Sequence, residues 1–249
     1  FGYHLRSSLP ADAKVLNSIW LYRCKRRPDG TLLKHKTRIC ADSLMQEKFR
    51  DYWDTYAPVC QWSLVCLILI LSAMLGLPSS QIDFTQAFPN ADIDGDVYIA
   101  IPQGWYYDRS QDKLLQHEDP EFRDRLHCIK LLKNLYGTKQ AARNWFLCLS
   151  ECLQRKHGFK PSAIDPCIFI RDDCIIALYT DDCCIFGRDV QVIDDLKTTL
   201  AQDFLLRDEG SIKDFLGVRL SFATDPASPN GPELMTMTHD TDRSHRLNS

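Results

Sequence analysis

Two adjacent aspartates, Asp181 and Asp182, interrupt an apolar stretch in the segment LYTDDCCIF. Like charges this close repel each other, and burial disfavours the ionised form of a carboxyl group, unless a cation compensates. Mg²⁺ prefers oxygen ligands and is usually held by one or two carboxylates together with substrate phosphates. Asp83 supplies a third carboxylate, since it ends the apolar stretch of QIDF in a similar way. Together they predict a two-metal site of the kind that stabilises the attacking and leaving oxygens in phosphoryl transfer.

An ordinary polar turn is the alternative interpretation of Asp181-Asp182, because aspartate is a favoured turn residue. A second pair, Asp172-Asp173, also lies between two apolar stretches, and we interpret it as a plain turn that faces solvent. Spacing alone therefore does not separate a metal site from a turn at Asp181-Asp182.

Charge is distributed unevenly along the chain. The 249 residues are 45% hydrophobic and 25% charged, with a net charge of −3, which is an ordinary globular composition. Residues 1–50 contain eleven basic and four acidic side chains (net +7), whereas residues 165–215 contain five basic and twelve acidic ones (net −7). A basic part and an acidic centre suit a polyanion held near metal ions, although two solvated faces would give the same asymmetry.

The chain contains eleven cysteines, an odd number without a recurring spacing. The adjacent pair Cys183-Cys184 suits neither a zinc knuckle nor an easy disulfide. We therefore expect a reduced, intracellular fragment of a longer protein. Cysteines within apolar stretches are expected to act as small core residues, namely Cys60, Cys66, Cys128, Cys148 and Cys152.

The segment LVCLILILSAMLGL, residues 64–77, is almost wholly apolar. A membrane-spanning helix needs roughly twenty such residues, and this segment is shorter and is followed by Pro78. We therefore predict a helix that is buried on all sides, and no membrane association.

Hydrophobic periodicity predicts the remaining elements. The best helix lies over residues 139–158, with Gly158 at the position of a C-terminal cap, and a second amphipathic helix runs through Val192 to Phe204. Strands are expected within residues 18–27, 31–40, 79–88, 97–101, 167–170, 174–179, 183–186 and 215–222. Helices mixed with antiparallel hairpins indicate an α+β fold.

The order of these motifs resembles one family closely. LYTDD resembles the Tyr-x-Asp-Asp box of reverse transcriptases, and the surrounding motifs resemble the copia-type polymerases of LTR retrotransposons. The matching segments are, in order, IWLYRCKRRPDG, KTRICADS, DYWDTYAPV, QIDFTQAF, VYIAIPQGW, LYGTKQAARNWF, DPCIFI, LYTDD and IKDFLG. The resemblance covers about residues 8–222.

The resemblance implies a right-handed polymerase fold with fingers and palm and an antiparallel palm sheet. Residues 1–224 would form the fingers and palm, and residues 225–249 a weakly structured tail or a truncated thumb. Asp83, Asp181 and Asp182 match the catalytic carboxylates. All three would bind two Mg²⁺ ions, for which Mn²⁺ can substitute, and the backbone carbonyl of Phe84 would assist.

The resemblance also implies residues that contact the nucleotide and the primer. Lys25 and Arg38 match residues of the fingers that clamp the triphosphate, and Phe88 matches the aromatic gate beneath the sugar. Tyr136 lies where the palm meets the incoming nucleotide, although it could equally be a core residue. The primer grip would comprise Phe215, Leu216 and Gly217.

The implied activity is RNA- and DNA-templated synthesis of DNA by a copia-type reverse transcriptase. Its partners would be an RNA template, a DNA primer–template duplex and dNTPs. The native context would be a polyprotein with integrase and RNase H, in the cytoplasm within a virus-like particle if it is expressed.

Departures from the family pattern leave two rival interpretations. Thr180 replaces an apolar residue, Pro89 and Thr138 replace leucines, and Asp42-Ser43 replaces a basic residue and Gly. None of these changes removes a catalytic group, but a decayed remnant that folds and binds nucleic acid without polymerising is one alternative. A two-metal nuclease or recombinase is the other, and Lys25 and Arg38 argue against it because neither enzyme needs such a clamp.

Overall fold

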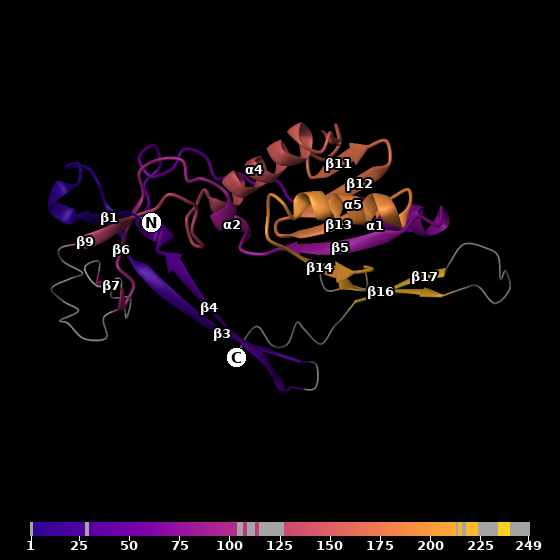
Figure 1. Ribbon diagram of the computed structural model, residues 1–249, viewed down its shortest axis with the longest axis horizontal. Coiled ribbons are helices and arrows are strands. Elements are labelled where there is room, and N and C mark those ends of the chain that lie inside the picture. The colour runs from indigo at the N-terminus through magenta and orange to yellow at the C-terminus, as the bar shows by residue number, and fades with distance from the viewer. Residues whose placement is uncertain are drawn as a thin grey trace. The chain divides into compact units, whose positions relative to one another are not determined.

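A computed structural model describes residues 2–27, 30–103, 107–108, 113–114, 127–212, 214–215, 218–223 and 234–239 (Figure 1). The chain divides into two compact units. Unit 1 comprises residues 1–57 and 88–148, and unit 2 comprises residues 58–87 and 149–249. Helices lie between runs of mostly antiparallel strands, which confirms the expected α+β class.

Unit 1 is built around a four-stranded sheet in the order β1-β9-β6-β2. Its strands are β1 (Gly2–Leu5), β2 (Val15–Leu16), β6 (Tyr98–Ala100) and β9 (His127–Lys130). The pairs β1–β9 and β6–β9 are antiparallel, and β2–β6 is parallel. Residues of these strands and of the neighbouring segments form a compact apolar cluster, which comprises Leu16, Ala41, Val97, Ile99, Ile129, Leu131 and Leu135.

A long hairpin extends from this core (Figure 1). It consists of β3 (Ser18–Arg26) and β4 (Leu32–Ala41), close to the predicted bounds. Most of its side chains are exposed, and burial increases toward the end of β4, at Cys40 and Ala41. The base of the hairpin is therefore anchored in the core, while most of its length presents side chains to solvent. Short elements complete unit 1, namely η1 (Arg6–Ser8), η2 (Ser43–Met45), β7 (Tyr107–Asp108) and β8 (Lys113–Leu114).

Unit 2 contains a six-stranded antiparallel sheet in the order β10-β11-β12-β13-β5-β14. Its strands are β5 (Ser79–Phe84), β10 (Lys160–Pro161), β11 (Ile168–Arg171), β12 (Cys174–Tyr179), β13 (Asp182–Gly187) and β14 (Leu206–Gly210). The central strand β13 is buried from Cys183 to Gly187, and its first residue, Asp182, is only partly buried. The apolar run CCIF thus fixes the strand and leaves an aspartate at its end.

Helix α5 (Val190–Leu200) packs against β13 and β5. It buries Ile193, Leu196 and Leu200, a spacing of three and four residues that places them on one face. The carboxylate of Asp189 caps its N-terminus by accepting a hydrogen bond from the backbone N–H of Val192 at 2.9 Å.

Helix α4 (Ala141–Arg155) joins the two units along the chain, as does the short helix α2 (Ala87–Asn90). In α4 the buried residues include Trp145, Leu149 and Leu153, spaced by four. The helix ends before Gly158, whose φ of +72° reverses the chain. The predicted position of the helix and of its terminating glycine therefore agrees with the structure.

Helix α1 (Trp62–Met74) corrects the prediction of a helix that is buried on all sides. Only Val65, Leu69 and Ser72 are buried, whereas Leu67, Ile70, Leu71 and Met74 are 44% to 63% exposed. The residues of this helix are apolar on every side. Its sequence therefore contains no polar face that would reveal which side meets solvent. Among the described residues, no helix is long and apolar enough to cross a membrane.

A three-stranded sheet follows, in the order β15-β16-β17. Its strands are β15 (Asp214–Phe215), β16 (Val218–Ala223) and β17 (Leu234–His239). Strand β17 pairs with β16 from Ala223 opposite Leu234 to Val218 opposite His239. Part of the segment expected to be a weakly structured tail thus forms a strand, because β16 offers it an edge for pairing.

Candidate active site

Asp83 and Asp182 lie directly opposite each other on neighbouring strands of unit 2. The antiparallel register of β5 and β13 pairs their Cα atoms, so both side chains share one face of the sheet. Side chains in such a pair have Cβ atoms about 4.5–5.5 Å apart, and two like charges there repel each other. Two strands that are distant in sequence therefore bring two carboxylates together at one end of the sheet.

Asp181 lies in the tight turn between β12 and β13. Tyr179 and Asp182 pair across the hairpin, so Thr180 and Asp181 form a two-residue loop. Thr180 adopts a φ of +56°, which a β-branched residue rarely does and which costs about 1–3 kcal/mol. The backbone N–H of Phe84 donates to the carbonyl oxygen of Asp181 at 2.9 Å and ties this loop to β5. The strained loop is thus held beside Asp83.

The electrostatics of this cluster disfavour an additional negative charge. The pKa of Asp182 is raised, first by burial and then by the charges of Asp181 and Asp83, with a smaller contribution from Glu209. A hydrogen bond with Gln81 opposes this shift only in part. Asp182 forms no ion pair with a lysine or arginine among the described residues. A divalent cation would supply the missing positive charge, and carboxylate oxygens are suitable ligands for Mg²⁺.

Arg207 is the one basic residue that the sheet register places next to this cluster among the described residues. It lies opposite Asp83 on β14, on the side away from β13. Its guanidinium pairs with Glu209 at 3.1 Å. Arg207 is therefore partly neutralised by its own neighbour on β14.

The second Asp-Asp pair has a different environment, at the other end of β12. Arg171 contacts both carboxylate oxygens of Asp173, at 2.6 Å and 3.2 Å, and this hydrogen bonding lowers the pKa of Asp173. Asp172 is exposed. Here the chain supplies its own counter-charge, as expected for a turn that faces solvent.

Three of the predicted nucleotide-binding residues contact one another in unit 1. The guanidinium of Arg38 lies over the ring of Tyr136, 4.8 Å from its centroid. On the same ring, Phe88 packs with its centroid at 5.0 Å and an interplanar angle of 50°. Tyr136 and Phe88 are both partly buried. The backbone N–H of Ala41 donates to the carbonyl oxygen of Tyr136 at 2.8 Å, so the base of the hairpin is fixed to this aromatic pair.

Lys25 lies on the same face of the hairpin as Arg38 but farther along it. Arg38 pairs with Leu21, and Lys25 pairs with Lys34. A separation of four residues corresponds to about 13 Å along a strand. Lys25 is exposed, whereas Arg38 is partly buried. The structure therefore groups Arg38 with Tyr136 and Phe88, and it places Lys25 apart from them.

The remaining predicted residues lie in unit 2. The side chain of Phe84 is buried in the core against Phe204, with the two rings perpendicular at 5.7 Å. Phe215 is also buried, and its ring stacks on that of Trp62 at 6.3 Å. The other two residues assigned to the primer grip, Leu216 and Gly217, lie outside the described residues.

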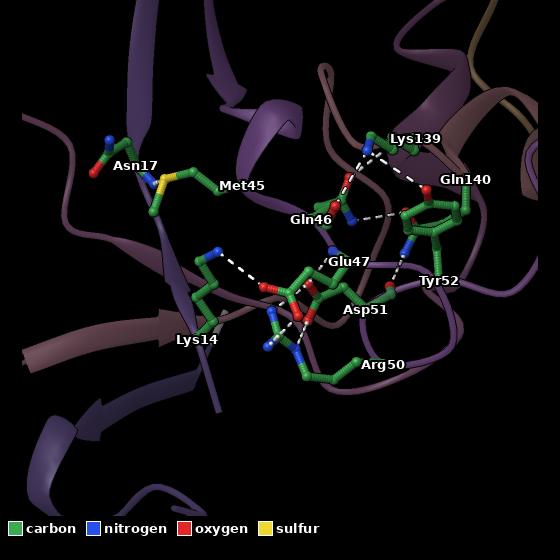
Figure 2. A network of polar contacts seen from close by, with 10 residues as sticks. All are labelled: Lys14, Asn17, Met45, Gln46, Glu47, Arg50, Asp51, Tyr52, Lys139 and Gln140. Atoms are coloured by element: carbon green, nitrogen blue, oxygen red, sulfur yellow. Dashed lines mark hydrogen bonds and ion pairs between the residues drawn. The ribbon is translucent and has the colours of Figure 1, made fainter. Parts of the chain in front are cut away.

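Sequence reasoning missed a buried polar network in unit 1 (Figure 2). The amide of Gln46 donates to the side-chain oxygen of Gln140 at 3.0 Å, and the Gln140 amide donates to the backbone carbonyl of Asp51 at 2.8 Å. The backbone N–H of Lys139 donates to the side-chain oxygen of Gln46 at 2.8 Å. The ammonium group of Lys139 lies 5.0 Å from the centroid of the Tyr52 ring. These contacts join the segment after the hairpin to the start of α4.

The same network continues through ion pairs (Figure 2). Arg50 pairs with Asp51 at 2.9 Å, and Lys14 pairs with Glu47 at 3.2 Å. Burial alone would raise the pKa of Asp51, but hydrogen bonds from Arg50 and from the backbone of Glu47 lower it overall. The segment DYWDTYAPV gave a signal only through its family resemblance, and Gln46 gave none, because its partner lies 94 positions away in the sequence.

The family model and the similar proteins point to the same family. The family model described as reverse transcriptase (RNA-dependent DNA polymerase) matches residues 3–227. The chain is 28% identical over 225 residues to the retrovirus-related Pol polyprotein from transposon TNT 1-94 of Nicotiana tabacum. It is 28% identical over 213 residues to that from transposon RE1 of Arabidopsis thaliana, and 30% identical over 196 residues to the transposon Ty1-ER2 Gag-Pol polyprotein of Saccharomyces cerevisiae. These alignments cover 88%, 84% and 77% of the chain, but only 16%, 14% and 10% of the relatives.

Proposed function

Because the chain belongs to the reverse transcriptase family, we propose that it is the polymerase core of a copia-type retrotransposon and synthesises DNA on RNA and DNA templates. In the proposed reaction, the 3′-hydroxyl oxygen of a primer attacks the α-phosphorus of a dNTP. A phosphodiester bond forms while the bond to pyrophosphate breaks. We assign the fingers to unit 1 and the palm to unit 2.

The single observation that carries this proposal is the convergence of Asp83, Asp181 and Asp182. The raised pKa of Asp182, caused by burial and by the other two carboxylates, means that this cluster suits divalent cations. We propose that Asp83 and Asp181 are the principal ligands, with Asp182 and the backbone carbonyl of Phe84 beside them. Two Mg²⁺ ions held there would stabilise the negative charge on the attacking and leaving oxygens.

We propose that the cluster of Arg38, Tyr136 and Phe88 binds the nucleotide. The guanidinium of Arg38 can donate two hydrogen bonds to phosphate oxygens while it stays over the Tyr136 ring. Phe88, which packs against the ring of Tyr136, would lie beside the sugar and leave no room for a 2′-hydroxyl. Lys25, as an exposed cation on the same face of the hairpin, would assist with the triphosphate.

The relatives support a proposal for the nucleic-acid substrates and for the context of the chain. The three relatives are Pol and Gag-Pol polyproteins, and the chain spans at most 16% of their length. We therefore propose a polyprotein context with an integrase and an RNase H, an RNA template and a DNA primer–template duplex as substrates, and a location in a cytoplasmic virus-like particle. A hydrophobic primer grip would include Phe215, Leu216 and Gly217.

Primer extension with Asp181→Asn tests the function. On an RNA template with an annealed DNA primer, dNTPs and Mg²⁺, we expect extension by the unmodified chain. Loss of several kcal/mol of transition-state stabilisation should slow the variant at least about 1,000-fold. Asp172→Asn is the matched control, because it removes an aspartate from the other Asp-Asp turn, and it should leave the rate unchanged.

Three outcomes separate the interpretations. Equal rates for Asp181→Asn and the unmodified chain would contradict the assignment of the metal ligands. Absence of extension by a folded unmodified chain, with nucleic-acid binding retained, would support a decayed remnant. Cleavage of the template without primer extension would support a nuclease.

A further inference from the structure

Three side chains of metal-ligand type meet in unit 2, and none of them belongs to the carboxylate cluster. They are Cys152 in the last turns of α4, His157 just after that helix, and Asp203 just after α5. The Cys152 Sγ lies 3.5 Å from Oδ2 of Asp203, and the His157 Nε2 lies 3.8 Å from the same oxygen. All three ligand atoms lie within 4.8 Å of one another. We propose that Cys152, His157 and Asp203 form a zinc site that links the ends of α4 and α5.

The buried face of His157 is the observation that points to a ligand. The side chain is only 8% exposed, and its Nε2 is buried without a hydrogen-bond partner. A buried polar atom without a partner is uncommon and costly, and an ion that belongs at the site is one physical explanation. The distance of 3.8 Å to Asp203 is too long for a hydrogen bond. A metal ion between the two atoms would satisfy both.

The contacts of Thr199 are compatible with the His157 tautomer that binds a metal through Nε2. Its hydroxyl oxygen lies 3.0 Å from the backbone carbonyls of Asp195 and Leu196, and 3.4 Å from the His157 Nδ1. A threonine hydroxyl has one proton to donate. When that proton is given to a helix carbonyl, the oxygen accepts from Nδ1–H, and Nε2 keeps its lone pair. This is the arrangement found in metal-binding histidines, whose other nitrogen donates a hydrogen bond.

Asp203 is oriented by a second contact. The ammonium of Lys156 pairs with its Oδ1, so Oδ2 is the atom directed to Cys152 and His157. Zinc binding would take the place of the Cys152 thiol proton, which now lies toward Oδ2, and would release that proton to solvent. One thiolate and one carboxylate then balance the two charges of the ion. The C-terminal end of α4 also carries partial negative charge, which favours a cation there.

The ligand set favours zinc over magnesium. Thiolate and imidazole are ligands of Zn²⁺, whereas Mg²⁺ requires oxygen ligands. Metal–ligand bonds of about 2.0–2.3 Å at the tetrahedral angle place ligand atoms about 3.5 Å apart. The observed 3.5 Å and 3.8 Å are close to that spacing. Water would occupy the fourth position, and Cys152, interpreted from sequence as a core residue, gains a second role.

Cobalt titration of the 249-residue chain tests the site. Co²⁺ bound by a thiolate gives a charge-transfer absorption, which Zn²⁺ should abolish by competition. Variants His157→Gln, Cys152→Ala and Asp203→Asn each remove one ligand. Loss of an outer-shell partner already costs about 10–100-fold in metal affinity, so each variant should lose at least about 100-fold.

Cys24→Ser is the matched control. Cys24 and His35 also form a cysteine–histidine pair, with Sγ and Nδ1 3.3 Å apart, but the pair is exposed on the hairpin and has no third ligand among the described residues. This variant should keep the cobalt absorption and the zinc affinity unchanged. Melting in EDTA identifies any variant that fails to fold.

A second measurement keeps the result interpretable. Zinc should raise the melting temperature of the unmodified chain and of Cys24→Ser, and it should have little effect on His157→Gln. Metal affinity of His157→Gln and Asp203→Asn within about twofold of the unmodified chain, in folded proteins, would overturn the proposal. So would loss of binding in Cys24→Ser alone.

Discussion

Alanine at Gly137 would test how the structure holds Tyr136 against the hairpin. Gly137 adopts a φ of +89°, and an added Cβ would lie 2.2 Å from the backbone oxygen of Ala41, where 3.4 Å is an ordinary contact. A left-handed conformation costs an L-residue about 1–2 kcal/mol, and overpacking costs about 1–3 kcal/mol more. The expected loss of folding free energy is therefore roughly 2–5 kcal/mol.

Gly30→Ala provides the control for backbone strain. Its φ is +85°, nearly the same as that of Gly137, but an added Cβ would meet no atom within 4 Å. It should cost only the strain, about 1–2 kcal/mol. For a chain of this size, each kcal/mol lowers the melting temperature by about 2–4 °C, so Gly137→Ala should melt clearly below Gly30→Ala.

The assay combines thermal melting with nucleotide kinetics. In Gly137→Ala the backbone of Ala41 must separate from Tyr136, and their hydrogen bond of 2.8 Å should weaken. Arg38 would then lose its place over the Tyr136 ring, and the KM for dNTP should rise more than in Gly30→Ala. Equal melting temperatures for the two variants would refute the close approach of Gly137 to Ala41.

Two other predictions concern single side chains. Burial and the neighbouring Asp181 and Asp83 raise the pKa of Asp182 above its unfolded value of about 3.9, so its stabilising contribution is complete below that value and is lost as pH rises through the folded pKa. Without divalent cations, Asp182→Asn should therefore be more stable than the unmodified chain at pH 7 and equally stable near pH 3. Denaturation at both pH values measures this difference. A variant that is less stable than the unmodified chain at pH 7 would contradict the prediction. Phe88 is partly buried, so Phe88→Ala should lower the folding free energy by about 2 kcal/mol, less than the 3–5 kcal/mol lost at a fully buried Phe. The same variant should let ribonucleotides compete with dNTPs. An unchanged ratio of dNTP to ribonucleotide incorporation in a folded, active enzyme would exclude the role of Phe88 as a gate.

Periodicity predicted most of the strands and the two amphipathic helices correctly, since these elements record their buried face in their own sequence. The hairpin of β3 and β4 and the three strands from Ile168 to Gly187 lie close to their expected positions. The α+β class and the family resemblance are confirmed. The prediction for helix α1 was wrong because its sequence is apolar on every side. Only tertiary packing decides that Val65 and Leu69 are buried.

Long-range pairing was not predictable in the same way. The contact of Arg38 with Tyr136 joins a strand to a loop almost one hundred residues later, and no local pattern records it. The buried amide pair of Gln46 and Gln140 is similar, because each residue alone reads as an ordinary polar side chain. The left-handed Thr180 also escaped prediction, since β-branched residues disfavour that conformation and the neighbouring strands impose it.

The two Asp-Asp turns show why the sequence pattern alone left the proposed metal site open. Both flank strand β12, and both are short acidic turns between apolar strands. At Asp173, Arg171 lies two residues away and supplies the compensating charge, which lowers the pKa of that carboxyl group. At Asp182 the nearest ionisable groups include two further carboxylates, which together with burial raise the pKa. The proposed metal site therefore rests on the charge that the chain leaves uncompensated, and this charge depends on the strand register that brings Asp83 opposite Asp182.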